Sequence, residues 1–471
     1  MAEKWIQNWL IFGNIFFFFY LMIYATYILV ANLIGSISLY RSRKLEQLHN
    51  ELNDSYYYPM SIIVPAYNEG SCIIQTVENL LKLDYKLYEI LVVDDGSTDD
   101  TRQVLMDRYD FKRDSDRPIR YQVPCKPIHE IWVAREKGIA ITLICKENGK
   151  CKADASNAAI NLAAYPYFVC MDADEVLQKD SLMYAARAIM SKGEVVAVGG
   201  NVKISNSVTF RDATPASARL GENFIVDVQV LEYSRAFVGS RIFHNIINTN
   251  LIISGGFGIF LKSAVIRAGG YDTTSMGEDM ELTMKLHQYY RSHKLPYHME
   301  YVPDSVCWTQ APESIGDLRV QRRRWHCGLI QNMWKYRRMA FNPRYGLIGL
   351  FMIPFMIFFE LFASFFILIG WFNILLSLLT HQINLPYVLY VMAAYMLLGI
   401  VMTVTVFIDK MNMKNDYFSG LDVIKAFGIA FLDSVIIRPW LFIVEFLSFF
   451  QYNRLKGRWI SPKRVQVKEI Q

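Results

Sequence analysis

The sequence predicts an α/β domain with a mixed, mostly parallel sheet flanked by helices, joined to an α-helical transmembrane region. Short apolar, β-branched runs alternate with helical segments between residues 58 and 171, which is typical of a mostly parallel sheet. Residues 5–40 contain no Asp, Glu, Lys or Arg. Residues 345–408 carry a single formal charge, that of Glu360. The polar domain is therefore enclosed between two apolar regions.

The first apolar stretch predicts an N-terminal transmembrane helix over about residues 9–38, within a segment that we place at 1–44. Roughly 20 apolar residues span a bilayer, so the stretch is long enough. No small-residue cleavage site follows it, which indicates a retained helix rather than a signal peptide. Arg41, Arg43 and Lys44 follow the helix, and the positive-inside rule then places the next domain in the cytoplasm.

We expect the cytoplasmic domain to cover residues 45–316, beginning with a polar linker at 45–55. Its sheet and helices are predicted from apolar periodicity. The expected strands are 61–65, 90–93, 139–145 and 167–171, and the expected helices are 75–83, 101–109 and 153–164. The stretch from about 106 to 140 is polar and rich in proline, and we interpret it as an insertion.

The second apolar region, residues 346–450, follows a segment at 317–345 that we predict to form amphipathic interfacial helices. Spans are expected at about 347–379 and 387–408. Asp433, Arg438 and Glu445 interrupt the last apolar stretch, 421–450, which favours an interfacial or re-entrant segment. The basic tail at 451–471 is then cytoplasmic, as the positive-inside rule requires.

Charge and cysteine content exclude several classes of protein. The net charge of +5 is modest, and the basic excess lies near the membrane segments, so no nucleic-acid partner is expected. Seven cysteines occur without a CxxC pair. That pattern favours reduced cytoplasmic thiols over a disulfide framework or a zinc site.

Carboxylates follow two of the predicted strands. Asp172-Ala173-Asp174 comes after strand 167–171, and alternation directs its two carboxylates to the same side. Such a pair is suited to Mg²⁺ or Mn²⁺, which also bind diphosphate oxygens, although a solvated acidic turn is the alternative. Asp94-Asp95 follows strand 90–93 and is suited to accept from a nucleotide hydroxyl. Ligands of parallel α/β sheets bind at these strand ends.

Three further elements lie where a substrate would bind. Tyr67 and Glu69 occupy a strand-to-helix loop, where Tyr67 is suited to stack on a base. Lys152 precedes an Ala-rich helix whose N-terminus would favour an anion. Glu278 and Asp279 begin another helix, and Asp279 is the better candidate for a general base. For each element the alternative is structural: a turn, a surface lysine or a helix cap.

A cluster of Arg, Gln and Trp lies at the edge of the membrane region, as Gln321-Arg322-Arg323-Arg324-Trp325. Arginine binds phosphate oxygens bidentately, and an aromatic face suits a sugar ring. We expect Arg324 and Trp325 to contact substrate. Arg322 and Arg323 are expected to face lipid headgroups instead.

In their order along the chain, these motifs resemble those of the membrane-embedded processive glycosyltransferases of family 2, which include cellulose, hyaluronan and poly-N-acetylglucosamine synthases. The motifs are the Asp pair, Lys152, Asp172-x-Asp174, Glu278-Asp279 and Gln321-x-x-Arg324-Trp325. The resemblance covers residues 58–345 most closely and implies a glycosyltransferase-A-like fold. Two departures are Gly277, where many members have Thr, and the absence of the cellulose-type gating motif.

The resemblance implies roles for individual residues. Tyr67, Glu69 and Asp95 would contact the uridine of a UDP-sugar, and Lys152, Asp172 and Arg324 would face its diphosphate and sugar. Asp174 would bind Mg²⁺ or Mn²⁺, and Glu278 and Asp279 would be catalytic, with Asp279 as the base. The acceptor would be bound by Gly256, Phe257, Gln321 and Trp325.

The expected function is therefore an inverting, processive glycosyltransferase that polymerises sugar from a UDP-sugar into a β-linked polysaccharide and passes it through the membrane. Glucose and N-acetylglucosamine are the favoured sugars. We place the protein in the plasma or inner membrane as a multi-pass protein, with the lipid bilayer and a growing polysaccharide as partners. Glu360 is a candidate for the channel lining, with a snorkelling charge as the alternative. Alternatives for the whole chain are a non-processive enzyme that adds one sugar to a lipid carrier and a non-catalytic membrane scaffold.

Overall fold

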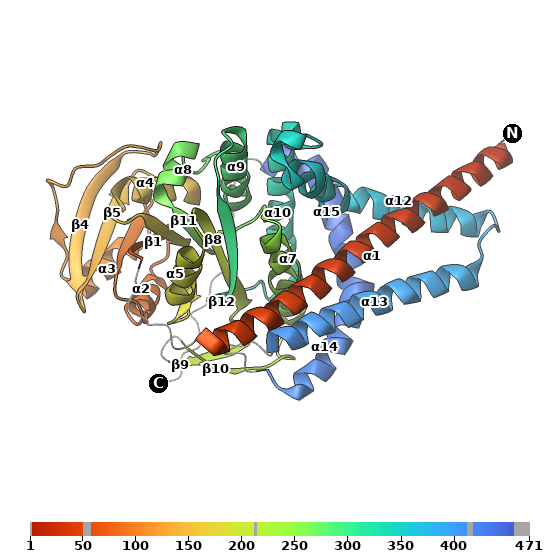
Figure 1. Cartoon of the computed structure of the whole chain (residues 1–471), viewed down its shortest axis with the longest axis horizontal. Helices are drawn as coiled ribbons and strands as arrows, with labels where there is room; N and C mark the ends of the chain where they lie inside the picture. Colours follow the sequence, from red (N-terminus) through yellow and green to blue (C-terminus); the bar gives the residue numbers. More distant parts are fainter. Residues whose placement is uncertain (1, 50–57, 212–213, 412–417, 456–471) are drawn as a thin grey trace.

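The computed structural model of the protein describes residues 2–49, 58–211, 214–411 and 418–455. An α/β domain forms one end of this part of the chain, and long helices extend from the other end (Figure 1). The N-terminus lies at the tip of these helices, far from the sheet. Residues 50–55 of the expected linker and 456–471 of the expected basic tail lie outside the described residues.

The described residues form one large sheet, with strand order β3-β4-β5-β2-β1-β6-β11-β8-β12-β7, and a separate hairpin of β9 and β10. The strand bounds are β1 Met60–Ala66, β2 Tyr88–Asp94, β3 Lys112–Arg113, β4 Ile128–Glu136, β5 Ile139–Lys146, β6 Tyr167–Met171, β7 Val176–Leu177, β8 Val195–Ile204, β9 Val208–Arg211, β10 Thr214–Ala218, β11 Phe257–Leu261 and β12 His298–Thr309.

The sheet is mixed, with most of its strands running the same way. The central strands β5, β2, β1 and β6 pair in parallel, and β12 pairs in parallel with β8. Strands β4, β11 and β7 run in the opposite direction. The expectation of a mixed, mostly parallel sheet is confirmed. Strand β11 brings the loop before it to the carboxyl end of β6, which is the edge where ligands of such sheets bind.

The helices of the α/β domain cover both faces of the sheet. Helices α2, α3 and α5 contribute to one buried apolar cluster, and α4, α8 and α9 contribute to the other. Their bounds are α2 Ile73–Leu80, α3 Thr101–Arg108, α4 Lys152–Leu162, α5 Ser181–Ser191, α8 Lys262–Ala268 and α9 Glu278–Ser292. Ile62, Ile63 and Val64 of β1 are fully buried because both faces are covered, which explains the continuous apolar runs of the central strands.

A second group of helices joins the sheet to the apolar end of the molecule. Helix α6 continues through the π-helical segment η1 into α7, and α10 packs against α15. The bounds are α1 Ala2–His49, α6 Phe224–Ser234, η1 Arg235–Ser240, α7 Arg241–Ile246, α10 Ile315–Lys335, η2 Arg337–Met339, η3 Pro343–Tyr345, η4 Ile348–Met352, α11 Ile353–Phe355, η5 Met356–Leu361, α12 Ala363–Leu379, α13 Leu385–Met411, α14 Gly420–Leu432, η6 Asp433–Ile437 and α15 Arg438–Leu455.

Three helices of the described residues are long and apolar enough to cross a membrane: 4–41, 388–411 and 420–454. The segments 348–361 and 363–379 form a fourth candidate, bent by 49° at the break between them. Residues 420–454 are one continuous helical run in the structure. Its placement in the membrane, as a crossing or as the expected interfacial or re-entrant segment, stays a prediction.

Most expected elements of the α/β domain are present, with one correction. Strand 167–171 has the expected bounds, and the other expected strands and helices differ by a few residues at their ends. The interpretation of 106–140 as an insertion is wrong, because β4 pairs along its whole length with β5 and extends the sheet. Its polar composition reflects its place near the edge of the sheet, where, among the described residues, only the two-residue β3 lies beyond it and most of its side chains are partly or fully exposed.

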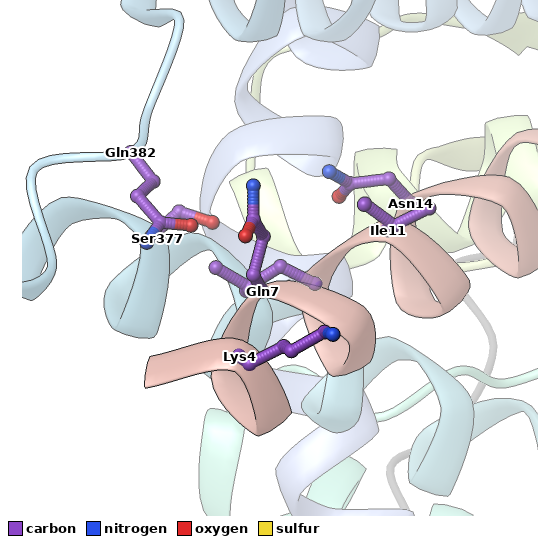
Figure 2. A pocket seen from close by; sticks show the side chains of 7 residues that line it. Lys4, Gln7, Ile11, Asn14, Ser377 and Gln382 are labelled. Carbon is purple, nitrogen blue, oxygen red and sulfur yellow. The ribbon is translucent and has the colours of Figure 1, made fainter. Parts of the chain in front are cut away.

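A pocket of about 740 Å³ lies at the tip of the helical end, between the first turns of α1 and the end of α12 (Figure 2). Lys4, Gln7 and Asn14 line it from α1, and Ser377 and Gln382 line it from the opposite side. It contains none of the residues that the sequence assigned to catalysis or donor binding, so it belongs to the apolar region and not to the sheet edge.

Candidate active site

The carboxyl end of β6 carries the Asp172-x-Asp174 pair, as the sequence predicted. Both residues are partly exposed, while Ala173 between them is buried. Lys152, the first residue of α4, donates to Asp172 Oδ1 at 2.6 Å and to the carbonyl of Gly255 at 2.6 Å. The lysine therefore connects the β6 end to the loop that precedes β11.

The environment keeps Lys152 charged. Burial by itself would lower the pKa of Lys152, but Asp172 and the nearby acidic groups raise it above its usual value. A permanently charged ammonium in this position is suited to an anionic ligand.

Glu175 is a third carboxyl at this edge that sequence reasoning missed. Its side chain is buried beneath the Asp172–Asp174 turn, where it accepts from the backbone N–H of Asp172 at 3.2 Å. Burial raises the pKa of Glu175 well above its usual range, and the charges of Asp172 and Asp174 raise it further. A Cβ on Gly256 would lie 2.1 Å from Glu175 Oε1, so a side chain at this position would displace the Glu175 carboxyl. The acidic residue directly after Asp174 was the available signal.

Glu278 and Asp279 lie in the first turn of α9, opposite this edge. Asp279 Oδ2 accepts from the backbone N–H of Gly255 at 3.2 Å, and its Oδ1 accepts from that of Met280 at 2.7 Å. The loop that binds Lys152 through its carbonyl thus binds Asp279 through its N–H. The structure brings Lys152, Asp172 and Asp279 around a single loop.

The start of α9 is positioned by α10. Gly277 and Gly328 approach so closely that a Cβ on Gly328 would lie 3.0 Å from the Gly277 nitrogen. Asn332 donates to the carbonyl of Gly277 at 2.9 Å, and Gln331 accepts from the N–H of Met276 at 2.9 Å. A Cβ on Gly277 itself, the departure from the family pattern, would lie 3.3 Å from Asn332 Nδ2 and 3.4 Å from the Gly328 Cα, so the close approach demands glycine mainly at position 328.

Arg324 lies close enough to Glu278 for their charges to interact. Burial, followed by the charge of Asp279, raises the pKa of Glu278 to about 7, whereas Lys152 and Arg324 act in the opposite direction. This carboxyl titrates near neutral pH and shares its surroundings with the catalytic candidates. The structure brings Arg324, which the sequence assigned to the donor, into the neighbourhood of Glu278 and Asp279.

Arg322 does not face lipid headgroups, and that expectation is wrong. It is 7% exposed and forms a bidentate ion pair with Glu232 of α6, at 2.6 and 2.7 Å. Its guanidinium also lies over the ring of Trp325, 4.5 Å from the centroid. The Arg322 side chain, which the sequence assigned to the membrane surface, instead joins α10 to α6 and packs against one face of the Trp325 indole.

Trp325 remains accessible, at 41% exposure, and its ring lies 6.5 Å from that of Tyr233. Gln321, one turn earlier, is partly buried, and its Oε1 has no hydrogen-bond partner within the described part of the chain. Phe257 is fully buried in β11, so its side chain is not exposed at the sheet edge. Gly255 and Gly256 contribute backbone to the same edge.

The second acidic pair, Asp94-Asp95, forms its ion pair and hydrogen bonds with other residues of the protein. Lys146, whose side chain is 0% exposed, forms ion pairs with Asp95 and with Asp154, the latter at 2.6 Å. Asp95 Oδ1 also accepts from the N–H of Gly149 at 3.0 Å, and Asp94 Oδ1 from that of Ser97 at 2.9 Å. Lys146 ends β5, the parallel neighbour of β2, and a lysine at the end of a buried strand was the signal that could have found it.

Tyr67 and Glu69 lie in the loop after β1, beside the Asp95 loop. The N–H of Asp95 donates to the carbonyl of Ala66 at 2.9 Å, which joins the two loops. Tyr67 is 45% exposed, whereas Glu69 is buried. The exposed phenol is thus free to meet a flat ligand at the sheet edge, while Asp95 lies deeper, against Lys146.

Two family models match this chain. The model of "Glycosyl transferase family group 2" matches residues 167–408, and that of "Glycosyl transferase family 2" matches residues 61–123. A poly-β-1,6-N-acetyl-D-glucosamine synthase of Staphylococcus aureus is 28% identical over 319 residues, 66% of this chain and 65% of that protein. The synthase of Staphylococcus epidermidis is 28% identical over 333 residues, 67% of each chain.

Among solved structures, a mannosyltransferase from Pyrobaculum calidifontis, in complex with GDP-Man and Mn²⁺, superposes with a TM-score of 0.49 and 17% identity. It covers 92% of this chain and 99% of its own. The first family model spans more than half of this chain and includes the Asp172–Asp174 turn, the Glu278-Asp279 pair and the Arg324-Trp325 pair. The chain belongs to glycosyl transferase family group 2.

Proposed function

We propose that this protein is an inverting, processive, membrane-embedded glycosyltransferase that extends a β-linked polysaccharide from a UDP-sugar donor and passes it through the membrane. UDP-N-acetylglucosamine is our first candidate donor, since the staphylococcal relatives are named as poly-N-acetylglucosamine synthases. UDP-glucose is the second. One observation carries the proposal: the Gly255 loop holds a cation and a carboxylate together, through Lys152 on its carbonyl and Asp279 on its N–H.

The donor diphosphate would lie against Lys152, Asp172 and Arg324, with Tyr67 and Glu69 on the uridine side and Asp95 behind them. The carboxylates of Asp172 and Asp174 fit Mg²⁺ or Mn²⁺, which usually bind one or two carboxylates together with substrate phosphates. No group of three metal-ligating side chains occurs in the described ranges, so such an ion would depend on the substrate for its other ligands. When bound, the ion would offset the charge of the departing diphosphate.

Asp279 would remove the proton from the acceptor hydroxyl, which attacks the anomeric carbon from the face opposite the diphosphate. One displacement inverts that carbon, so an α-linked donor gives a β-linkage. The backbone contacts of Asp279 hold its carboxylate in place before the substrate arrives. Trp325, backed by Arg322, would stack on the acceptor sugar.

Continuity between this site and the apolar helices supports transfer through the membrane. Helix α10, which carries Gln321, Arg324 and Trp325, packs against α15. Glu360 of η5 lies where the charges of Arg438 and Glu232 act on it, so ionisable groups connect the site to the helical end. Intramembrane carboxylates usually face a polar pathway, and we place Glu360 on the path of the polymer. In this arrangement the catalytic domain is cytoplasmic and the membrane is the plasma or inner membrane.

The test is transfer by the purified protein in lipid nanodiscs, with radiolabelled UDP-N-acetylglucosamine or UDP-glucose and Mn²⁺ or Mg²⁺. We expect one donor to give long polymer on a gel, EDTA to abolish transfer, and added Mn²⁺ or Mg²⁺ to restore it. Products limited to one sugar on a lipid would support the non-processive alternative. Absence of transfer from every UDP-sugar, in a preparation that is folded by circular dichroism, would refute the proposed function.

A further inference from the structure

The face of α6–η1–α7 that lies towards the active site carries a cation that the motifs leave unassigned. Tyr233, Phe237 and Arg241 recur at four-residue spacing and therefore share one side of this helical run. Phe237 stacks on Tyr233 with ring centroids 5.6 Å apart, and Tyr233 in turn approaches Trp325. The Arg241 guanidinium lies 3.8 Å from the centroid of Phe237. The row thus leads from the acceptor-side indole to Arg241.

One nitrogen of the Arg241 guanidinium lacks a hydrogen-bond acceptor among the residues that the structure describes. Its Nη1 is buried without a hydrogen-bond partner in the described part of the chain. The hydroxyl of Tyr301, on β12, is also buried without a hydrogen-bond partner among the described residues. The centroid of the Tyr301 ring lies 6.5 Å from that of Phe237. A buried donor without an acceptor costs on the order of 1–3 kcal/mol, so two in one place indicate that a ligand supplies the acceptors.

The position of Arg241 assigns it to the acceptor side. Burial lowers the pKa of Arg241, and Tyr301 and Asp279 counteract this effect, so the guanidinium lies within electrostatic reach of the candidate base. The groups proposed for the donor diphosphate, Lys152 and Asp172, are joined to each other on the β6 side. Arg241 instead extends the row that starts at Trp325.

We propose that Arg241 and Tyr301 bind the acceptor sugar, by donating hydrogen bonds to neutral oxygens of the residue whose hydroxyl meets Asp279. This inference rests on the proposed function and adds the residues that hold the acceptor. The ligand chemistry is an oxygen acceptor next to an aromatic face, which a ring hydroxyl and an acetamido carbonyl both supply. A planar guanidinium stacked on Phe237 has its edge free to donate in this direction.

The experiment compares wild type, Arg241→Ala, Arg241→Lys and Tyr301→Phe in nanodiscs, by steady-state transfer to added β-linked oligosaccharides. We expect Arg241→Ala to raise the KM for acceptor by about 10- to 100-fold, and Tyr301→Phe by about 3- to 10-fold. The KM for UDP-sugar should change less than twofold in both. Arg241→Lys should recover only part of the loss, because an ammonium lacks the planar fork. Exposed Arg338→Ala is the matched control and should behave as wild type.

Acceptors with N-acetylglucosamine, glucose or glucosamine at the reacting end separate the two oxygen sources. If the acetamido carbonyl is bound, the acceptor preference for N-acetylglucosamine over glucose falls in Arg241→Ala; if a ring hydroxyl is bound, all acceptors weaken equally. Unchanged acceptor KM in Arg241→Ala and Tyr301→Phe, with an active wild type, would overturn this inference and leave the proposed function intact. If Arg241→Ala fails to fold, Tyr301→Phe, which removes a single oxygen, decides the question.

Discussion

The two acidic pairs of the sheet edge look alike in sequence and differ in the structure. Asp94-Asp95 and Asp172-x-Asp174 each follow a buried parallel strand. Asp95 is buried, and the buried Lys146 forms ion pairs with both Asp95 and Asp154. Asp172 is partly exposed, and its lysine partner comes from the first residue of a helix beside the substrate-facing loop. Similar acidic pairs are thus buried against a lysine in one case and partly exposed at the sheet edge in the other.

The difference arises from what lies next to each strand end. Strand β2 has β5 as a parallel neighbour, and β5 ends in Lys146, so the Asp95 carboxylate meets a buried cation. Strand β6 has antiparallel β11 beside it, and the loop before β11 brings the carbonyl of Gly255 to Lys152, the partner of Asp172. The neighbouring strands, rather than the motifs themselves, decide which carboxylates are buried in ion pairs and which are partly exposed.

The largest expected effect is on the open side, at the candidate base. Asp279→Asn removes the proton acceptor and keeps the shape of the side chain, although its single carbonyl oxygen can retain only one of the two backbone hydrogen bonds, from Gly255 or from Met280. We expect kcat to fall by about 10²–10⁴-fold. Binding of UDP-sugar, measured by calorimetry, should stay within about threefold of wild type. Asp107→Asn, on the exposed face of α3, is the control. Retention of wild-type kcat by Asp279→Asn would exclude this carboxylate as the base.

The next effect separates the two lysines. Lys146→Met leaves Asp95 and Asp154 buried without their cation, and the free energy of unfolding should fall by about 3–5 kcal/mol. Lys152→Met leaves a partly exposed Asp172, so stability should change less while the KM for UDP-sugar rises. Denaturant unfolding and donor titration of both variants measure the contrast, with exposed Lys112→Met as control. A similar stability loss for both lysines would remove the distinction between a buried and an open pair.

The smallest expected effect is the pH dependence of stability at Glu278. The pKa of a glutamate in the unfolded chain is about 4.3, whereas burial raises the pKa of Glu278 in the folded protein to about 7. The native state therefore binds the proton more tightly, and stability decreases as pH rises between these values. Glu278→Gln should remove this loss and be more stable at pH 8 by about 1–3 kcal/mol, with little difference at pH 4.

Melting temperatures across this pH range, with exposed Glu194→Gln as control, measure the effect. Parallel curves for wild type and Glu278→Gln would show that this carboxyl does not titrate near neutral pH. That result would also contradict an electrostatic interaction of Glu278 with Asp279 and Arg324.

Much of the fold was accessible from sequence because burial on both sides of a strand leaves a continuous apolar run. Residues 167–171 illustrate this, with strand bounds that match the expectation. Strand β4 was missed because it lies near the edge of the sheet, with only the two-residue β3 outside it among the described residues, and keeps polar side chains while its backbone pairs with β5. For the candidate site, sequence could nominate residues at strand ends and helix starts, since their motifs are local; their roles stay predictions.

The partners of those residues could not be found in the same way. Arg322 was assigned to lipid because it lies in a basic run before an apolar region, yet Glu232, 90 positions away, binds it. Glu175 and Arg241 have no motif of their own, and their significance lies in burial near Asp172 and Asp279. Local sequence records which groups are present, and long-range packing decides which of them face one another.

The sequence by itself determined the class of this protein, because apolar runs, acidic strand ends and the Gln-x-x-Arg-Trp cluster are properties of short segments. The tertiary structure decided which charged side chains form buried ion pairs and which stay partly exposed at the sheet edge. Ion pairs such as Lys146–Asp95 and Arg322–Glu232 join segments far apart in the chain. Their energies depend on burial and distance, and both quantities exist only once the sheet and helices have assembled.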